Sequence, residues 1–200
     1  MSIAPQVFDR TSSAGGASSG AGPSAAALPA PARATLGRTA ALGLDDLAAM
    51  KPAALAELYR TALTPSVPAL NGDLVGRMLA IPVLPRWMFG LMRRFAAWTL
   101  FPWRGKSFTS RDAGHGDGIN RVFGDSKPRR WFRFETFVAP SRAGAFDAFQ
   151  LDYDNPDNPG LIRAIKDEVR EVAPGLYLGL AYLMWRKQPR LVLYFGLARR

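Results

Sequence analysis

The chain has 200 residues, of which 48% are hydrophobic and 21% charged, a composition typical of one globular domain with a sizeable core. It has no cysteine and one histidine, His115, which excludes disulfides, thiolate nucleophiles and multi-histidine metal sites. The net charge of +10 suits either an anionic partner or a solvated basic surface.

Residues 1–40 consist largely of Ser, Gly, Ala and Pro. Such a segment cannot bury enough hydrophobic surface to offset the entropy lost on ordering, so we predict a disordered tail. It lacks the basic stretch followed by an uninterrupted hydrophobic run that a secretory signal requires. We therefore expect a cytoplasmic location, where the lack of cysteine fits the reducing environment.

Hydrophobic residues recur every three or four positions between Leu44 and Ala62. This spacing predicts helices, and Pro52 is acceptable near the start of a second helix because the first turn needs no amide donor. We therefore assign residues 41–70 to a short helical region.

Beyond residue 70 the hydrophobic pattern shifts towards a period of two, which is typical of β-strands. Turns rich in Gly, Pro and Asp separate the segments, and short strands joined by such turns pair antiparallel. The predicted strands are Asp73–Ile81, Gly105–Ser110, Gly118–Phe123, Arg130–Ala139, Ala145–Tyr153, Gly175–Arg186 and Arg190–Ala198.

Several of these strands are hydrophobic on both faces. In residues 176–185, Leu178 and Leu180 share one face, while Tyr177 and Ala181 share the other. An open sheet would expose one face to water, whereas a barrel encloses one face and can cover the other with helices. The sequence therefore predicts a mainly β fold with some helix, an antiparallel β-barrel over residues 71–200.

Two segments interrupt the predicted strands. Residues 86–103 are hydrophobic and basic, and we predict a lid helix over 86–100, because its arginines exclude a normal transmembrane span. In Asn158–Val172, Asn158 is a suitable N-cap and Pro159 a suitable first helical residue. Hydrophobic residues follow at helical spacing, so we predict one further helix there, between the late strands.

The stretch Gly72–Gly76 (GDLVG) has the pattern Gly-x-hydrophobic-x-Gly, and Gly175–Gly179 (GLYLG) repeats it. This pattern resembles the first strand of calycin-type barrels, which include lipocalins, fatty-acid-binding proteins, nitrobindin-like proteins and bacterial proteins with a Gly-x-Trp-x-Gly motif. Leu74 stands in the place of that tryptophan. The resemblance implies a helical lid between the first two strands and a hydrophobic or amphipathic small molecule bound in the barrel.

A second resemblance extends from Gly72 to Leu197. The motifs PWRGKSF, LDYDNPDNP, IRAIKDEVREVAPGLYLG and LVLYF occur in this order in a set of uncharacterised bacterial proteins. This resemblance implies no activity.

Trp103, Arg104 and Lys106 place an indole and two cations at the start of a predicted strand. Either cation can pair with a ligand carboxylate, although Arg104 can instead pair with an acidic residue such as Glu135. We expect the protein to bind or carry a hydrophobic molecule such as a fatty acid, isoprenoid or polyketide. The expected ligand-binding residues are Trp103, Arg104, Lys106, Phe132, Phe134, Gln150, Asp152 and Tyr182.

The alternative is a cofactor-independent isomerase, cyclase or lyase that uses the same cavity. A carboxylate removed from water becomes a stronger base, and a phenol supplies a proton donor. The candidate bases are Asp152 and Glu135, and the candidate donors are Tyr177 and Tyr182.

A third hypothesis is binding to an anionic membrane surface through aromatic and basic residues of the lid. The residues concerned are Trp87, Arg93, Arg94 and Trp98. The Arg and Phe residues of 129–137 also suit a platform for single-stranded nucleic acid, but no nucleic-acid-binding motif accompanies them, so we do not expect such a partner. His115 lies between glycines in a turn, a poor place to hold a metal or haem, and no metal or cofactor is expected.

Overall fold

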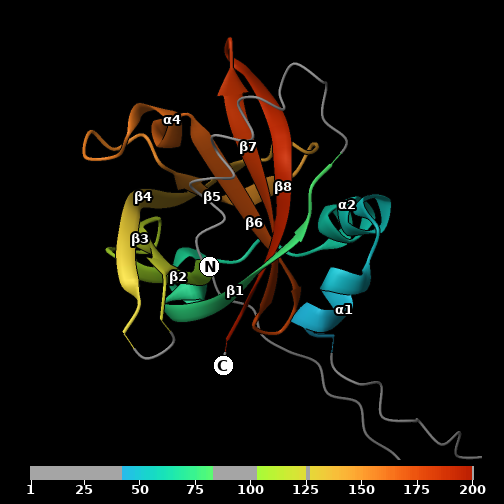
Figure 1. The fold of residues 1–200 in the computed structure, drawn as a ribbon. Coiled ribbons are helices and arrows are strands. Elements are labelled where there is room, and N and C mark those ends of the chain that lie inside the picture. Colours follow the sequence, from blue (N-terminus) through green and yellow to red (C-terminus); the bar gives the residue numbers. More distant parts are fainter. Residues whose placement is uncertain (1–41, 83–102, 125–126, 200) are drawn as a thin grey trace, which may run out of the picture. The chain divides into compact units, whose positions relative to one another are not determined.

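The computed structural model of the protein describes residues 42–82, 103–124 and 127–199. Eight antiparallel strands form a closed barrel in which each strand pairs with the next in the chain and β8 pairs with β1 (Figure 1). The strands are β1 Gly72–Ala80, β2 Trp103–Ser110, β3 His115–Val122, β4 Arg129–Pro140, β5 Asp147–Asp152, β6 Ile165–Ala173, β7 Leu176–Trp185 and β8 Gln188–Ala198. This confirms the predicted mainly β, antiparallel barrel.

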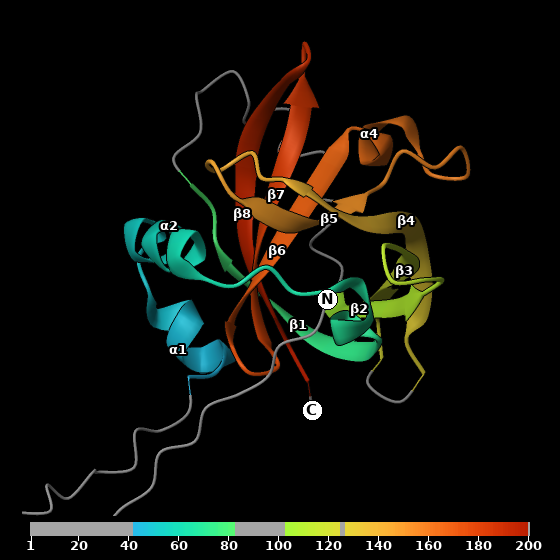
Figure 2. The same cartoon turned by 180° about the vertical axis from the view of Figure 1, so that it is seen from behind.

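Two helices cover part of the outer surface of the barrel. They are α1, Leu44–Ala49, and α2, Pro52–Thr61, and Pro52 occupies the first turn of α2 as predicted. Both helices lie on the side of the barrel opposite β3 and β4 (Figures 1 and 2). Their buried residues Leu47, Leu55 and Tyr59 pack against outward-facing side chains of β7 and β8.

The two hydrophobic faces of β7 have the two environments that the sequence predicts. Leu178 and Leu180 face outward into the cluster beneath α1 and α2. Tyr177 and Ala181 face inward and belong to the core of the barrel. Every residue from Leu176 to Leu183 is therefore buried, because the sheet is covered on both sides.

Hydrophobic side chains fill part of the barrel interior. The 3-10 helix η1, Val67–Leu70, contributes Val67 and Leu70 to this part of the core. They pack there with inward-facing residues that include Leu74, Phe108 and Phe149. None of these five residues lines the cavity described below.

The predicted helix over 158–172 is wrong in most of its length. Only Gly160–Arg163 form a helix, α4, and Ile165–Ala173 form strand β6, which pairs with β5 and β7. Residues four positions apart lie on one face of a strand as well as of a helix, so Ile165 and Val169 fit both structures. Asn158 is not the N-cap, because its side-chain amide bonds the carbonyls of Arg133 and Tyr153 at 2.7 and 2.9 Å.

The predicted tail over 1–40 and the predicted lid helix over 86–100 lie outside the described residues. The proposed membrane contacts Trp87, Arg93, Arg94 and Trp98 belong to that second segment. Within the described part of the chain, no helix is long and apolar enough to cross a membrane.

Candidate functional site

A cavity of about 90 Å³ lies between inward-facing side chains of the barrel, and no residue of η1 lines it. Most of its wall is hydrophobic, with side chains from β1, β2, β3, β4, β6, β7, β8 and α4. The lining residues are Met78, Trp103, Lys106, Asn120, Val122, Phe132, Tyr153, Ile162, Ile165, Asp167, Ala181, Leu193 and Phe195.

A polar cluster of four residues interrupts the hydrophobic wall. The amine of Lys106 lies 2.9 Å from Oδ1 of Asn120 and 3.2 Å from Oδ2 of Asp167, and it also bonds the hydroxyl of Tyr153. The Tyr153 hydroxyl donates to Oδ2 of Asp167 at 3.3 Å, and it accepts from Nδ2 of Asn120 at 3.2 Å. The cluster therefore joins β2, β3 and β6 to the residue that follows β5.

Burial shifts the pKa values of the cluster in opposite directions. It lowers the pKa of the Lys106 amine, and the Asp167 carboxylate opposes this shift. It raises the pKa of Asp167, which Lys106 opposes, and it raises the pKa of Tyr153 well above the usual value. A buried charge loses the solvation of water, so each charged form is stable only through its partner.

Aromatic rings surround the Lys106 amine. Its nitrogen lies 5.1 to 5.4 Å from four ring centroids, a distance at which the ring faces attract a cation. The four rings are those of Trp103, Phe134, Tyr153 and Phe195. The site thus combines a polar head of fixed geometry with a hydrophobic surround.

A β-bulge at the start of β2 turns Trp103 and Lys106 into the interior and leaves Arg104 exposed outside. The register to β3 shifts between Trp103 and Gly105, and Gly105 has φ +131°. A Cβ at Gly105 would lie 1.9 Å from the carbonyl oxygen of Leu74, so only glycine fits. Simple alternation places Arg104 and Lys106 on one face, and the bulge separates them.

The remaining predicted ligand-binding residues divide between the two sides of the sheet. Phe132 lines the cavity, and Phe134 packs in the core beneath Lys106. Phe134 is buried, whereas Phe132 is half-buried and also lines a groove on the outer surface. Gln150, Asp152 and Tyr182 do not line the cavity.

The four predicted catalytic residues do not meet in the cavity. Asp152 is partly exposed and pairs with Lys166 on the outer face. Glu135 is exposed opposite Asp152 in the β4–β5 register. Tyr177 is directed inward, but its hydroxyl donates to the carbonyl of Ala69 in η1 at 3.2 Å. None of these four predicted residues therefore lines the cavity.

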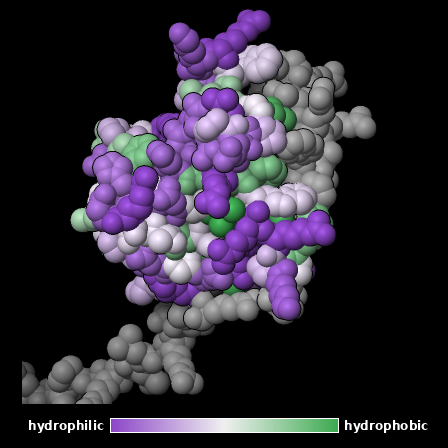
Figure 3. Space-filling model, turned by 90° about the vertical axis from the view of Figure 1, so that its left-hand side faces the viewer, coloured by the Kyte–Doolittle hydropathy of each residue, from purple (hydrophilic) through white to green (hydrophobic). Residues whose placement is uncertain are grey.

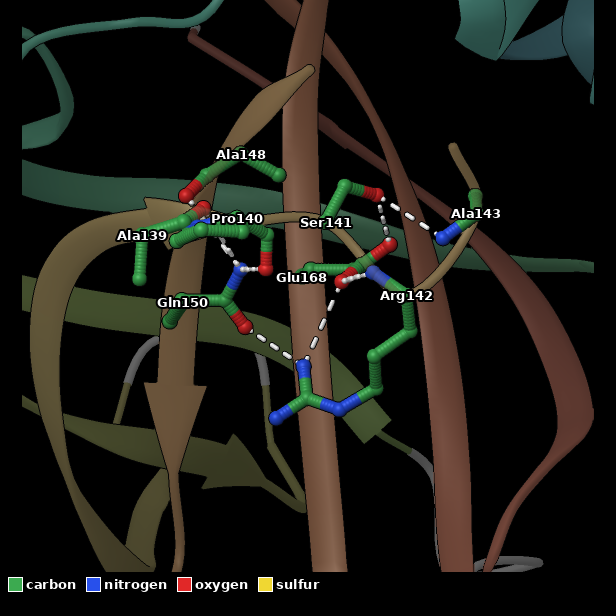
Figure 4. A network of polar contacts seen from close by, with 8 residues as sticks. All are labelled: Ala139, Pro140, Ser141, Arg142, Ala143, Ala148, Gln150 and Glu168. Carbon is green, nitrogen blue, oxygen red and sulfur yellow. Dashed lines mark hydrogen bonds and ion pairs between the residues drawn. The ribbon is translucent and has the colours of Figure 1, made fainter. Parts of the chain in front are cut away.

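A second polar cluster, around Glu168, lies on the outer face of the sheet (Figure 4). The fully buried Glu168 carboxylate accepts from the Ser141 hydroxyl at 2.6 Å, and from the amide and guanidinium of Arg142 at 3.0 and 3.3 Å. Arg142 also donates to Gln150 at 2.5 Å and lies 5.8 Å from the ring of Tyr182. This cluster holds the loop after β4 against the barrel.

Of the inner cluster, formed by Lys106, Asn120, Tyr153 and Asp167, only Lys106 is among the residues predicted from the sequence. Tyr153 follows Leu151 by two residues, a spacing that predicts a shared strand face, and both side chains are buried inside. Asp167 was assigned to a helix, and Asn120 carried no signal beyond its place in a predicted strand. The sequence signal that could have revealed Asp167 is its place between Ile165 and Val169, because these three residues alternate along β6 and share its inner face.

The outer surface over β3 and β4 is largely hydrophilic, with hydrophobic residues in scattered patches (Figure 3). The exposed residues Arg130 and Arg133 line two adjoining grooves there, together with Ile119. His115 is exposed at the start of β3, 3.5 Å from Asp112. Among the residues described, no three His, Asp or Glu side chains gather closely enough to hold a metal ion.

No family model and no curated protein matches the sequence. Among solved structures, the chain is similar to a protein from Thermomonospora curvata, with a TM-score of 0.50. The two share 20% sequence identity, and the match covers 76% of this chain and 88% of the other. At this level of identity the likeness concerns the fold alone, and it supports the barrel architecture.

Proposed function

We propose that the protein binds a small, mostly hydrophobic molecule inside the barrel, with a polar group of that molecule at the Lys106–Asp167 pair. The observation that carries this proposal is the cavity itself, because a hydrophobic wall with a few convergent polar groups is typical of small-molecule sites. Arg104 has no part in it, since its side chain lies outside the barrel.

The size of the cavity narrows the class of ligand. A volume of about 90 Å³ is somewhat smaller than the roughly 150 Å³ of an engineered protein cavity that binds benzene, so it suits a molecule of about one ring. A complete fatty-acyl chain exceeds this volume. The proposed ligand is therefore a ring-sized molecule, or a larger one whose ring-sized end enters the barrel.

The test is whether phenol and toluene bind to the protein, as measured by ligand-observed NMR. Ala181→Leu adds bulk at an inward-facing wall residue of β7 and should abolish binding, while Val138→Leu, at an exposed position of β4 that does not line the cavity, should leave it unchanged. If neither probe binds the wild-type protein, or if Ala181→Leu binds as well as wild type, the proposal fails.

A second candidate function, cofactor-independent acid–base catalysis, is favoured by the inner cluster. Asp167 and Tyr153 meet in the cavity, and burial raises the pKa of both groups. In this role Asp167 removes a proton beside a carbonyl group, and the Tyr153 hydroxyl donates a hydrogen bond to the enolate oxygen. Asp167 and Tyr153 thus replace the acids and tyrosines that the sequence suggested.

Cyclohexanone in D₂O provides the test of this second function. An active protein should accelerate the exchange of the protons beside the carbonyl, as followed by proton NMR, and Asp167→Asn should abolish the acceleration. Exchange at the rate of buffer alone in the wild-type protein would rule the reaction out for this substrate class.

We further propose that the barrel is of the calycin type and that the protein acts in the cytoplasm. Two similar glycine pairs support the first point. Gly72 and Gly175 have positive φ, while Gly76 and Gly179 lie under the rings of Trp103 and Phe195. The absence of cysteine supports the second.

A further inference from the structure

One oxygen of the buried carboxylate in the cavity has no partner among the described residues. Oδ2 of Asp167 accepts from Lys106 and Tyr153, whereas Oδ1 accepts from no group. The residue is 5% exposed and lines the cavity. Buried carboxylate oxygens are hydrogen-bonded in nearly all proteins, so this oxygen points to a missing donor.

The Lys106 ammonium has no hydrogen left for a ligand. An ammonium group has three hydrogens, and the Lys106 amine has three acceptors, on Asn120, Tyr153 and Asp167. The indole N–H of Trp103 donates to Oδ1 of Asn120 at 3.2 Å. A ligand donor that reaches Oδ1 of Asp167 therefore finds an acceptor without a partner, whereas Lys106 has no free hydrogen.

The charges of Lys106 and Asp167 limit the class of ligand further. A carboxylate ligand would lie beside Asp167, with a like charge and no free ammonium hydrogen to bind. A cationic ligand would lie beside the Lys106 ammonium. Water does not screen either repulsion in the interior, so a neutral ligand is favoured.

We propose that the cavity selects a neutral, ring-sized ligand with a hydroxyl or N–H group, which donates a hydrogen bond to Oδ1 of Asp167. This inference rests on the proposed function, because it presumes that a small molecule enters the cavity. Phenols, alicyclic alcohols and azoles have the required chemistry. It replaces the fatty-acid carboxylate expected from the sequence.

The test compares three probes at pH 7 by calorimetry or NMR titration: phenol, toluene and benzoate. Phenol and toluene have the same number of heavy atoms and differ in the hydroxyl group. A hydrogen bond to a charged acceptor should make phenol bind about tenfold more tightly than toluene, although toluene is the more hydrophobic. Benzoate should not bind.

A double variant, Lys106→Met with Asp167→Leu, removes both charges and the open acceptor together. It should reverse the preference, so that toluene binds more tightly than phenol. The wild-type comparison decides the proposal even if this variant does not fold. Equal or tighter binding of toluene by the wild type, or binding of benzoate, would overturn the donor inference. Failure of all three probes to bind would overturn the proposed function instead.

Discussion

The amine of Lys106 and the carboxylate of Asp167 lie 3.2 Å apart in the barrel interior, and both side chains are nearly inaccessible to water, at 4% and 6% exposure. The residues are 61 positions apart in the chain and belong to β2 and β6. Each charge is tolerated in this place only because the other is present.

Loss of either charge alone should therefore destabilise the protein strongly. We expect Lys106→Met and Asp167→Leu each to lower the free energy of unfolding by about 3–5 kcal/mol, because each leaves an uncompensated buried charge. The double variant should lose less than either single variant. Urea denaturation at pH 7 measures all three, and losses that simply add in the double variant would contradict the prediction.

The two single-charge variants should respond to pH in opposite directions. In Asp167→Asn, the Lys106 pKa falls further below its ordinary 10.5, because Asp167 no longer raises it. Between the lowered pKa of Lys106 in the folded protein and 10.5 in the unfolded chain, the unfolded chain binds more protons. The free energy of unfolding therefore rises with pH in this range, up to about pH 10.5.

In Lys106→Met the remaining group is Asp167, whose pKa rises further above 3.8 without the nearby cation. Here the folded protein binds more protons, so the free energy of unfolding falls as the pH rises above 3.8. Urea denaturation across this range, with the double variant as reference, measures both slopes. Parallel pH profiles in the two variants would exclude an electrostatic role for the pair.

The barrel could be predicted from the sequence because its strands are unusually hydrophobic. Leu178 and Tyr177 occupy opposite faces of β7, and a closed sheet covered by helices is the arrangement that buries both. Strand β6 could not be recognised in the same way. Asp167 occupies an inward position there, and a charged residue at that point hides the alternation of the strand.

Asp167 is therefore both a central residue of the candidate site and the reason why β6 was not predicted as a strand. Sequence patterns commonly fail at residues of a candidate site, because such residues do not follow the hydrophobic alternation. Lys106 was proposed for ligand binding, but its partners depend on the register of distant strands. The β-bulge at Gly105, which separates Lys106 from Arg104, leaves no mark in the hydrophobic pattern. Alternation predicts the face on which Tyr153 lies, but a single tyrosine on a strand gives no sign of its hydrogen-bond partners.

Two glycines face aromatic rings across neighbouring strands, and adding a methyl group there should be costly. Gly179 lies opposite Phe195 and Gly118 opposite Phe134, and a Cβ would lie 2.2 and 2.1 Å from the nearest ring atom. Since both rings are buried, Gly179→Ala and Gly118→Ala should each lower the free energy of unfolding by about 1–3 kcal/mol.

The control for these variants is Gly160→Ala, because a Cβ at this exposed position in α4 has no atom within 4 Å. Thermal and urea denaturation of the three variants measure the difference. A loss of stability in Gly160→Ala as large as in Gly179→Ala would show that the rings are not the cause.

The polar cluster around Glu168, on the outer face of the sheet, should stabilise the fold without affecting ligand binding in the cavity. Arg142→Ala removes the cation from Glu168, whose side chain is fully buried, and leaves the carboxylate with the Ser141 hydroxyl and one backbone amide. We expect the free energy of unfolding to fall by about 3 kcal/mol, because breaking a buried pair leaves an uncompensated charge. The dissociation constant for phenol should not change, because Arg142 does not line the cavity.

Arg163→Ala is the matched control for this prediction, since Arg163 pairs with the exposed Asp154 at 2.7 Å. Water screens an exposed pair, so this variant should unfold at nearly the urea concentration of the wild-type protein. If Arg142→Ala and Arg163→Ala lowered the free energy of unfolding equally, burial would not make the Arg142–Glu168 pair more stabilising than an exposed pair. A weaker affinity of Arg142→Ala for phenol would mean that the two faces of the sheet are coupled through β6, in which Asp167 and Glu168 are adjacent residues.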